Sequence, residues 1–472
     1  MKRKKIVLYN PKAVFYDMPL ALMAIGSALD PQHYEVVIID GRVDTKPLKQ
    51  VLEHAKDALC LGITSLTGNP LNDALKVTRA VRAQEAQLPI IWGGWHTSLF
   101  AEETLRDEPA VTLTVQGQGE ATFRELVACF DSGADVSSVQ GITYRDASGH
   151  IIKNPGRPLE DMNFLPRVDY ELINVERYFQ KKKRRQFDYI SSTGCRFRCT
   201  FCADPFVFSR KWTAIQPERM GEELSFWQKK YGFTDINFQD ETFFTKRQRV
   251  AQIAEEFLHR DIKSTWAGTM RADQGSRMSD EDFDLCKKGG LRRVLVGVES
   301  GSQEMMDWLV KDIKIEQVYE TARRCAQRDI HVIFPFIVGF PNESEQSVRD
   351  TLKVARELNS MHSGFTTPIF YFKPYPGSKI TADVVAQGYQ LPKTIEEWAD
   401  FDYIGSSGPW VTPQKYQLIE RFKFYNKLAG TRRRFLILPL QWLAQLRCEM
   451  NLFQFPFEKF LADTFVPKQQ LS

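Results

Sequence analysis

Short hydrophobic runs alternate with amphipathic segments through the first 130 residues. The runs have the length of buried strands, and the segments between them carry hydrophobic residues at helical spacing. The pattern predicts strands over residues 5–9, 34–39, 58–63, 89–92 and 111–115, and helices over 20–29, 47–55, 71–83 and 122–130. Strand–helix alternation through short links predicts a parallel, doubly wound α/β sheet that binds ligands at the carboxyl ends of its strands.

The pattern changes after residue 130. A hairpin with a turn at Ser148-Gly149 is predicted over residues 141–153, and the prolines that follow it indicate extended chain. Strand–helix units resume at residue 186, which predicts a parallel partial (β/α)6 barrel with its active face at the carboxyl ends of the strands. We expect an α/β domain over 1–130, a linker over 131–185, the barrel over 186–400 and a helical C-terminal cap over 401–472.

Composition narrows the class of protein. The 472 residues are enough for two or three domains, and 43% hydrophobic and 26% charged residues are ordinary for a globular chain. A formal net charge of +4 does not indicate a nucleic-acid-binding protein. The N-terminal residues do not resemble a signal peptide, and no apolar stretch is long enough to span a bilayer. Of the 8 cysteines, three are clustered and five scattered, so we expect a reducing cytoplasm rather than a disulfide framework.

The three clustered cysteines follow a β-like segment. Cys195, Cys199 and Cys202 form a C-x3-C-x2-C pattern that can surround one metal centre. They are one short of the four ligands that close a structural zinc site or saturate a cubane iron–sulfur cluster. A labile zinc site is the rival interpretation, but the nearest histidines, His150 and His259, are distant in sequence. The pattern therefore favours a [4Fe–4S] cluster with one iron open to a ligand.

This cysteine motif resembles that of the radical S-adenosylmethionine (SAM) enzymes. The resemblance implies that the open iron chelates the amino and carboxylate groups of SAM, and that reductive cleavage yields a 5′-deoxyadenosyl radical. Phe201, directly before the third cysteine, matches the aromatic position that the family places against adenine. Such chemistry also implies a reducing electron donor such as flavodoxin or ferredoxin.

Later strand ends carry further matches to this family. The resemblance assigns Asp240 and Glu241 to the SAM amino group, Arg271 to its carboxylate, Glu299 and Ser300 of a G-x-E-S-G pattern to the fourth-strand contact, and Gly339 to a backbone contact with adenine. A guanidinium can bind a carboxylate through two parallel hydrogen bonds, and a buried glutamate needs polar partners. For Asp240 and Glu241, a helix N-cap followed by a first-turn acid is the alternative. Tyr375 faces either the substrate or its own Pro-Tyr-Pro-Gly turn.

Glycines and small residues gather after three of the predicted N-terminal strands, where they let the backbone approach a large planar ligand. A dinucleotide site would need G-x-G-x-x-G after the first strand, and the chain has Asn10-Pro11-Lys12-Ala13 there. The segment instead resembles the cobalamin-binding domain that is fused to many radical SAM enzymes. The resemblance assigns cobalamin contacts to Thr64, Ser65, Leu66, Gly93, Gly94, Gly117, Gly119 and Glu120.

One departure affects the expected cobalt ligand. Cobalamin proteins that ligate cobalt through histidine carry D-x-H-x-x-G after the first strand, and this chain has no histidine there. The resemblance therefore implies cobalamin without a protein His ligand, with His96 as a loop residue near it. The alternative is a degenerate flavodoxin-like scaffold that no longer binds a corrinoid.

Together the matches cover about residues 1–400 and resemble the class B radical SAM methyltransferases. They imply C-methylation at an unactivated carbon of a small molecule, such as a natural product, a tetrapyrrole or a lipid. Radical cyclisation, oxidation or rearrangement without methyl transfer is the alternative, and a non-catalytic corrinoid-binding protein with a structural cluster is the second. A methylthiotransferase is disfavoured because residues 1–130 lack a second cysteine triplet.

Aromatic and basic residues dominate the last 70 or so positions, including Trp410, Tyr416, the run Arg432-Arg433-Arg434 and Trp442. A helical cap over the barrel is the default prediction. A basic, aromatic amphipathic segment could instead rest on a membrane surface, which would place a cytoplasmic protein at the inner face of the membrane.

Overall fold

The structure is a computed structural model that describes residues 3–401, 408–430, 438–450 and 456–458. The chain divides into two compact units. The first comprises Met1–Trp266, Lys288–Gly290 and Tyr375–Tyr403, and the second comprises Ala267–Lys287, Leu291–Pro374 and Ile404–Ser472. The arginine run at 432–434, which belongs to the predicted C-terminal cap, lies outside the described residues.

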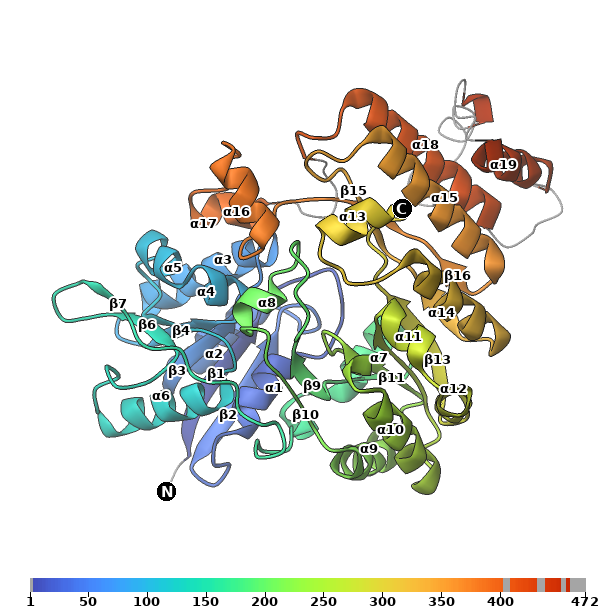
Figure 1. Ribbon diagram of the computed structural model, residues 1–472. Helices are drawn as coiled ribbons and strands as arrows, with labels where there is room; N and C mark the ends of the chain where they lie inside the picture. Colours follow the sequence, from blue (N-terminus) through green and yellow to red (C-terminus); the bar gives the residue numbers. More distant parts are fainter. Residues whose placement is uncertain (1–2, 402–407, 431–437, 451–455, 459–472) are drawn as a thin grey trace. The chain divides into compact units, whose positions relative to one another are not determined.

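A seven-stranded sheet forms the N-terminal part of the first unit (Figure 1). Its strands are β1 (Lys4–Asn10), β2 (Tyr34–Asp40), β3 (Ala58–Thr64), β4 (Ile90–Gly93), β5 (Leu113–Val115), β6 (Ile142–Arg145) and β7 (Ile151–Lys153). The order is β2-β1-β3-β4-β5-β6-β7, with β1 to β5 parallel and the β6–β7 hairpin antiparallel. The predicted doubly wound sheet is confirmed, and the predicted hairpin extends its edge.

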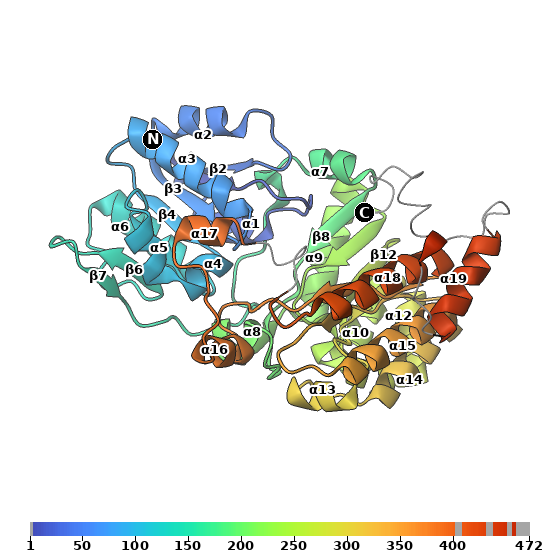
Figure 2. The same ribbon diagram turned by 90° about the horizontal axis from the view of Figure 1, so that it is seen from above.

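Helices cover both faces of this sheet (Figures 1 and 2). They are α1 (Leu20–Ser27), α2 (Pro47–Ala55), α3 (Pro70–Gln84), α4 (Trp95–Leu99), α5 (Ala101–Asp107) and α6 (Glu120–Ser132). Side chains alternate along β1, so that Ile6 and Leu8 pack with α1 and α6, while Val7 and Tyr9 pack with α2 and α3. This period of two is what a strand buried on both faces requires.

A late segment of the chain completes the second of these cores. After α16 (Lys379–Ala386), helix α17 (Ile395–Ala399) packs against α3 and α5 and adds Ile395 and Trp398 to the core that contains Val7 and Tyr9. Backbone N–H groups bind across this contact: Gly68 N–H donates to the Trp398 carbonyl at 3.1 Å, and Ile395 N–H donates to Asp107 at 2.9 Å. The N-terminal sheet is therefore closed by residues almost 400 positions along the chain.

The rest of the first unit carries the cysteine loop. Its elements are η1 (Tyr170–Leu172), α7 (Val175–Lys182), β8 (Gln186–Tyr189), β9 (Ser192–Gly194), α8 (Asp204–Val207), β10 (Trp212–Ala214), α9 (Pro217–Tyr231), β11 (Asp235–Phe238), η2 (Phe243–Thr245) and α10 (Arg247–His259). Strands β8 and β11 pair in parallel, and β9 pairs antiparallel with β10. The β9–β10 pairing closes the base of the loop that carries the three cysteines.

Strand–helix alternation continues through β12 (Thr265–Met270) into the second unit, as the sequence predicts. The elements are α11 (Ala272–Arg277), α12 (Asp280–Lys288), β13 (Leu291–Val296), α13 (Gln303–Trp308), α14 (Ile315–Gln327), β14 (His331–Ile333), β15 (Phe336–Val338), α15 (Glu345–Met361), β16 (Phe365–Thr366), β17 (Ile369–Tyr371), α18 (Pro413–Gly430) and α19 (Leu438–Met450). Within this unit β13–β14–β16 and β15–β17 pair in parallel.

Two extended segments of this unit are each divided into two short strands. Residues 334–335 separate β14 from β15, and residues 367–368 separate β16 from β17. Pro335 and Pro368 lie at the two breaks. A proline has no N–H to give to a sheet ladder, so each strand bends there and re-pairs beyond it.

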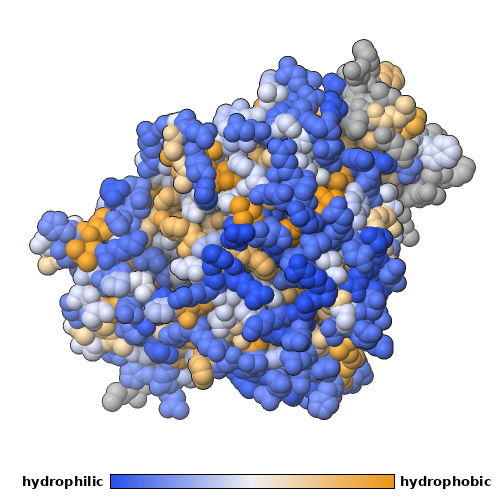
Figure 3. Space-filling view, in the orientation of Figure 1, coloured by the Kyte–Doolittle hydropathy of each residue, from blue (hydrophilic) through white to orange (hydrophobic). Residues whose placement is uncertain are grey.

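No helix among the described residues is long and apolar enough to cross a membrane. The face of the molecule in Figure 3 is mostly hydrophilic, with hydrophobic side chains in small areas between polar ones.

Trp398→Ala should lower the free energy of unfolding by about 3–5 kcal/mol, because it leaves a large cavity in a core shared by distant segments. Denaturant unfolding and protease resistance of the N-terminal sheet measure the loss. Trp442→Ala is the matched control, since that side chain is 76% exposed and should cost little. Equal loss in both variants would contradict the assigned role of α17.

His96 should make stability depend on pH. Burial lowers its pKa in the folded protein to about 3, so below its unfolded pKa of about 6.5 the unfolded chain takes up a proton that the folded chain does not. The stabilisation is therefore present above pH 6.5 and falls by up to about 1.4 kcal/mol per pH unit as pH drops. Denaturant unfolding at pH 7 and pH 5 tests this, and His96→Gln should reduce the difference by about 2 kcal/mol.

Candidate active site

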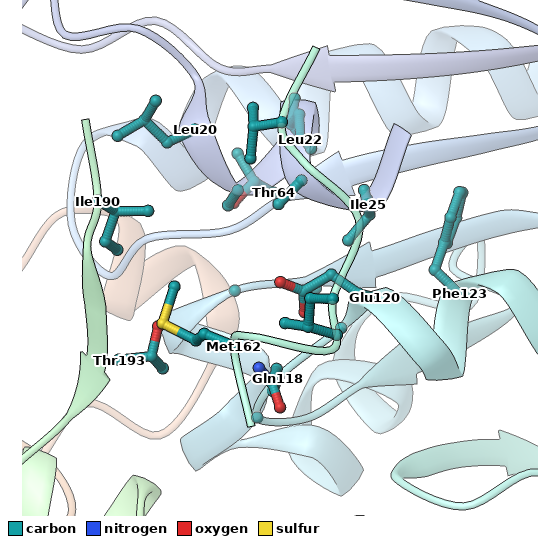
Figure 4. Close-up of a pocket in the computed structure, with 18 of the residues that line it drawn as sticks. Leu20, Leu22, Ile25, Thr64, Gln118, Glu120, Phe123, Met162, Ile190 and Thr193 are labelled. Atoms are coloured by element: carbon teal, nitrogen blue, oxygen red, sulfur yellow. The ribbon is translucent and has the colours of Figure 1, made fainter. Parts of the chain in front are cut away.

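A cavity of about 280 Å³ opens at the carboxyl ends of β3, β4 and β5 in the first unit (Figure 4). Of the residues assigned to cobalamin, Thr64, Gly93, Gly94, Gly117, Gly119 and Glu120 line it, whereas Ser65 and Leu66 do not. Most residues that the resemblance assigns to cobalamin therefore lie on the rim of one cavity, formed by three loops that are adjacent because their strands are adjacent in the sheet.

The walls of the cavity are mainly apolar. Leu20 and Ile25 of α1 and Phe123 of α6 line one side, and Met162 of the linker and Ile190 after β8 line another (Figure 4). A large apolar cavity with a few polar groups is the usual form of a small-molecule or cofactor site. β9 also contributes Thr193, and the segment after β11 contributes Glu241. The loops of the sheet and the strand that leads into the cysteine loop therefore share one cavity.

Glycine is required where the β4 loop meets β3. Gly94 has φ +100, and a Cβ atom there would lie 2.7 Å from the Ser65 carbonyl oxygen and 2.9 Å from the Thr64 hydroxyl. Gly117 also lies in the left-handed region, at φ +70, with open space where its side chain would be. Both positions favour glycine, and at both the backbone itself faces the cavity.

Glu120 brings a carboxyl group to this apolar cavity. It is the first residue of α6, and burial raises its pKa above the ordinary value. The first turn of a helix favours a negative charge, which partly offsets the desolvation. Glu120 therefore offers a carboxyl group that can hydrogen-bond to an amide-rich ligand in the cavity.

The prediction that His96 is a loop residue near the ligand is wrong. It lies in α4, is 1% exposed and contacts the Thr67 hydroxyl through Nδ1 at 3.1 Å. Its ring packs near Phe100 and Trp398, at centroid distances of 5.2 and 6.5 Å. His96 does not line the cavity, because the first turn of α4 directs it into the core that α17 closes.

The linker is fixed over the cavity by one arginine that sequence reasoning did not single out. Arg219 of α9 donates to the carbonyl oxygens of Met162, Asn163 and Leu165 at 2.7–3.0 Å. Its Nε donates to Glu223 at 2.8 Å, and the Tyr189 hydroxyl donates to the same carboxylate at 2.6 Å. The guanidinium thus satisfies three carbonyls of an extended, proline-rich segment that cannot pair in a sheet.

The three cysteines lie on the loop between β9 and β10, all half-buried. Burial raises the pKa of Cys202 well above its ordinary value, and Asp204, Cys199 and Cys195 raise it further. A positively charged metal centre would favour the thiolate forms that bind it. No three His, Cys, Asp or Glu side chains of the described residues stand ready-made around a single metal ion. The donor set of three thiols on one short loop fits a cluster.

Cys199 and Cys202 also border a second, more open cavity of about 640 Å³. The exposed side chains of Arg198 and Arg210 line it on the loop side, and Ser378 and Lys379 line it at the start of α16. Phe201 is half-buried in the same loop.

Asp240 anchors the start of the cysteine loop. Its carboxylate accepts hydrogen bonds from the Ser191 N–H at 2.9 Å, the Ser191 hydroxyl at 2.7 Å and the Ser192 hydroxyl. The alternative reading as a helix N-cap is wrong, because the next element is η2 and Thr242 precedes it. Burial raises the pKa of the Asp240 carboxyl above its ordinary value, and the nearby charge of Arg249 opposes this shift. Arg249 of α10, also missed from sequence, donates to the Ser191 carbonyl at 3.0 Å.

Glu241 behaves differently from its neighbour. Its carboxylate accepts from the Gly194 N–H at 3.3 Å, next to the first cysteine, and the side chain lines the apolar cavity. Burial raises its pKa to about 8, with further contributions from Asp204 and Asp240. At pH 7 the group is therefore mostly protonated in the chain alone, and a bound cation would favour its ionised form.

In the second unit, Arg271 and Glu299 are both buried and both contact Lys311. Arg271 is the N-cap of α11, donates from Nε to Asp273 at 3.0 Å and from Nη2 to the Lys311 carbonyl at 2.6 Å. Glu299 accepts from the Lys311 ammonium at 2.7 Å and has φ +68. Lys311 was not predicted, because nothing in the local pattern marks a lysine that acts on residues 12 and 40 positions earlier.

Ser300 and Gly339 have mainly backbone and packing roles in their unit. The Ser300 hydroxyl is fully buried, lies 3.1 Å from the Thr351 hydroxyl of α15 and accepts from the Ser302 N–H at 3.1 Å. Gly339 follows β15 at φ +81, and its N–H donates to Glu343. Both residues hold the shape of a strand end, and the adenine contact at Gly339 stays a prediction.

Comparison with known proteins matches each part to a family. Residues 7–127 match the B12 binding domain, and residues 189–355 match the Radical SAM superfamily. The chain is 27% identical over 407 residues to an uncharacterized methyltransferase of Pyrococcus horikoshii, covering 85% of this chain and 86% of that one. It is 24% identical over 345 residues to an anaerobic magnesium-protoporphyrin IX monomethyl ester cyclase of Synechocystis, covering 72% and 68%.

Solved structures show the same fold. The radical SAM methyltransferase TsrM of Kitasatospora setae, with tryptophan and a SAM analogue bound, gives a TM-score of 0.70 at 16% identity, covering 81% of this chain and 76% of that one. A second structure of TsrM, with cobalamin and a [4Fe–4S] cluster bound, gives 0.69 at 16% identity, covering 82% and 75%.

Asp240→Asn should lower the iron content of the reconstituted protein without unfolding it. The amide keeps the size of the side chain but loses charge-assisted hydrogen bonds to Ser191 and Ser192, each of which contributes about 1.5–3 kcal/mol. Iron per chain and the visible absorption of the cluster measure the effect. Asp261→Asn, at a largely exposed position, is the control. Equal iron in both variants would contradict the anchoring role.

Proposed function

We propose the function that follows from the family: the chain is a radical SAM enzyme with a B12-binding domain, and we infer that it methylates an unactivated carbon of a small-molecule substrate. One observation supports this most directly. The cavity that the cobalamin-assigned loops form is also lined by Thr193 of β9, which leads into the cysteine loop, and by Glu241, which accepts a hydrogen bond from Gly194 next to Cys195. A corrinoid in this cavity would lie beside the chain that holds the cluster.

The residues present fit the three groups that the family uses. Cys195, Cys199 and Cys202 would hold the [4Fe–4S] cluster. The glycine-lined cavity would hold cobalamin through backbone contacts and Glu120. When bound, cluster and SAM supply hydrogen abstraction from carbon, and methylcobalamin supplies the methyl group.

The residues of the chain itself would bind and orient SAM, and they would exclude water from the cavity. Arg271 has the chemistry to bind the SAM carboxylate, and Glu299 that to bind ribose hydroxyls. Phe201 and the backbone at Gly339 are assigned to adenine, and Glu241 to the SAM amino group. The apolar walls from α1, α6 and the linker keep water from the corrinoid cavity, which protects reactive species.

The class of substrate and the outcome of the reaction are a further part of the proposal. Relatives include a methyltransferase and a porphyrin-ester cyclase, so cyclisation without methyl transfer is the second candidate, favoured by the cyclase match alone. An apolar small molecule, such as a natural product, tetrapyrrole or lipid, agrees with the apolar cavity. A non-catalytic corrinoid carrier would not need Arg271 and Glu299 buried at neighbouring strand ends.

Two partners complete the proposal. The cluster needs an external electron, and the cavity that Cys199 and Cys202 border carries exposed Arg198 and Arg210. These cations suit an acidic carrier such as flavodoxin or ferredoxin, in a reducing cytoplasm. Trp442 and Leu446 of α19 are exposed, at 76% and 49%, which supports peripheral contact with a membrane surface.

The first experiment is the cofactor content of protein purified anaerobically from cobalamin-fed cells. We expect about one corrinoid and four irons per chain, and a cobalt(II) spectrum without nitrogen coupling below the ring. Methylated and cyclised products are then separated by mass, since transfer adds one methyl group. Iron without corrinoid would contradict methyl transfer through cobalt.

Cys195→Ala separates the two cofactor sites. It should remove the cluster and abolish SAM cleavage, yet leave corrinoid binding intact, because the cavity does not include Cys195. Cys129→Ala, half-buried on α6 and distant in sequence from the triplet, is the control that should keep both cofactors. Retained SAM cleavage in Cys195→Ala would contradict the assigned ligand set.

A further inference from the structure

One lysine contacts both of the buried charged residues that are assigned to SAM in the second unit. The Lys311 ammonium donates to Glu299 Oε1 at 2.7 Å, and the Lys311 carbonyl accepts from Arg271 Nη2 at 2.6 Å. Lys311, Arg271 and Glu299 are 6%, 7% and 8% exposed. A single residue therefore reaches the glutamate with its side chain and the arginine with its backbone.

The backbone around Lys311 is held in a conformation that side-chain-bearing residues rarely adopt. Val310 and Asp312, on either side, have φ +51 and +55, and Glu299 itself has φ +68. Left-handed backbone is a true outlier for β-branched valine. Such strain persists only where the surroundings determine it, and it clusters at ligand-binding sites.

The ion pair of Glu299 and Lys311 occupies space that a side chain at position 297 would otherwise fill. A Cβ atom at Gly297 would collide with Glu299 Oε1 and lie 3.1 Å from the Lys311 ammonium. The first glycine of the G-x-E-S-G pattern thus makes room for this ion pair. The last, Gly301, does so for helix α15, because a Cβ there would lie 2.6 Å from the Thr351 Cα.

We propose that Lys311 is a positioning residue for SAM. Its ammonium holds the Glu299 carboxylate in the orientation that suits the ribose hydroxyls, and its carbonyl, together with Asp273, sets the direction of the Arg271 guanidinium. A buried carboxylate without this partner would protonate or turn away. The inference rests on the proposed function, since it assumes that SAM binds here.

The two contacts make different predictions for the two halves of SAM. Replacing the side chain removes the partner of Glu299 but leaves the main-chain carbonyl for Arg271. Lys311→Met should therefore weaken binding of ligands that carry the ribose, and leave binding of methionine to the open iron unchanged.

The test uses anaerobically reconstituted full-length protein with matched iron content. Equilibrium dialysis gives dissociation constants for SAM, 5′-deoxyadenosine and methionine, and the electron paramagnetic resonance spectrum of the reduced cluster reports SAM at the iron. We expect Lys311→Met to weaken SAM and 5′-deoxyadenosine by about tenfold to a hundredfold, and Lys311→Arg to restore part of the loss. Lys314→Met, a largely exposed lysine paired with Asp307, is the control and should bind SAM like the wild type.

A double-mutant cycle tests whether Lys311 acts through Glu299. If it does, Lys311→Met adds little to the loss already caused by Glu299→Gln. Fully additive losses, equal weakening of methionine, or unchanged SAM affinity in Lys311→Met would each overturn the positioning role. Lys311→Gln, which keeps a donor without the charge, carries the same test where the methionine variant does not fold. A wild-type protein with a full cluster that binds no SAM would instead overturn the proposed function.

Discussion

A buried charge needs a partner, and this requirement accounts for the arrangement of the site more than any other interaction. Asp240, Glu223 and Glu299 are all buried, and each is met by donors from elsewhere in the chain. Burying a carboxylate without a partner costs much free energy, so each buried carboxylate requires a hydrogen-bond donor at its own position in the fold. The consequence is that the cysteine loop, the linker and a strand end are each held by one buried carboxylate.

The contacts of these three carboxylates hold segments that lie mostly outside helices and strands. The start of the cysteine loop is held by Asp240, the linker by Arg219 and Glu223, and the strand end at Glu299 by Lys311. Loops that bind ligands otherwise belong to the least stable parts of a protein. Ionic and charge-assisted contacts give these loops the rigidity that the sheet gives to the rest of each unit.

The sequence predicts well what is local. The five parallel strands follow from periodicity and the cysteine triplet is a short motif, because both patterns are decided within a few residues. Most of the cavity rim follows from the resemblance of the glycine-containing loops to a cobalamin-binding domain. Distant partners are different. Arg219, Arg249, Lys311 and Trp398 act on residues tens to hundreds of positions away, and an arginine or tryptophan on a helix has the same local pattern whether or not it does so. The error at His96 has the same origin, since its burial depends on α17.

The pairs also bear on how the cofactors are received. Glu299 and Lys311, and Asp240 with its serines, are already hydrogen-bonded in the chain alone. Groups that are oriented before a ligand arrives lose little conformational entropy on binding, so more of the contact energy appears as affinity. Glu241 is the exception, because burial leaves its carboxyl mostly protonated at pH 7. Its environment favours loss of the proton when a cation binds. Glu241 is therefore expected to change its protonation state on ligand binding, whereas the other residues are already in place.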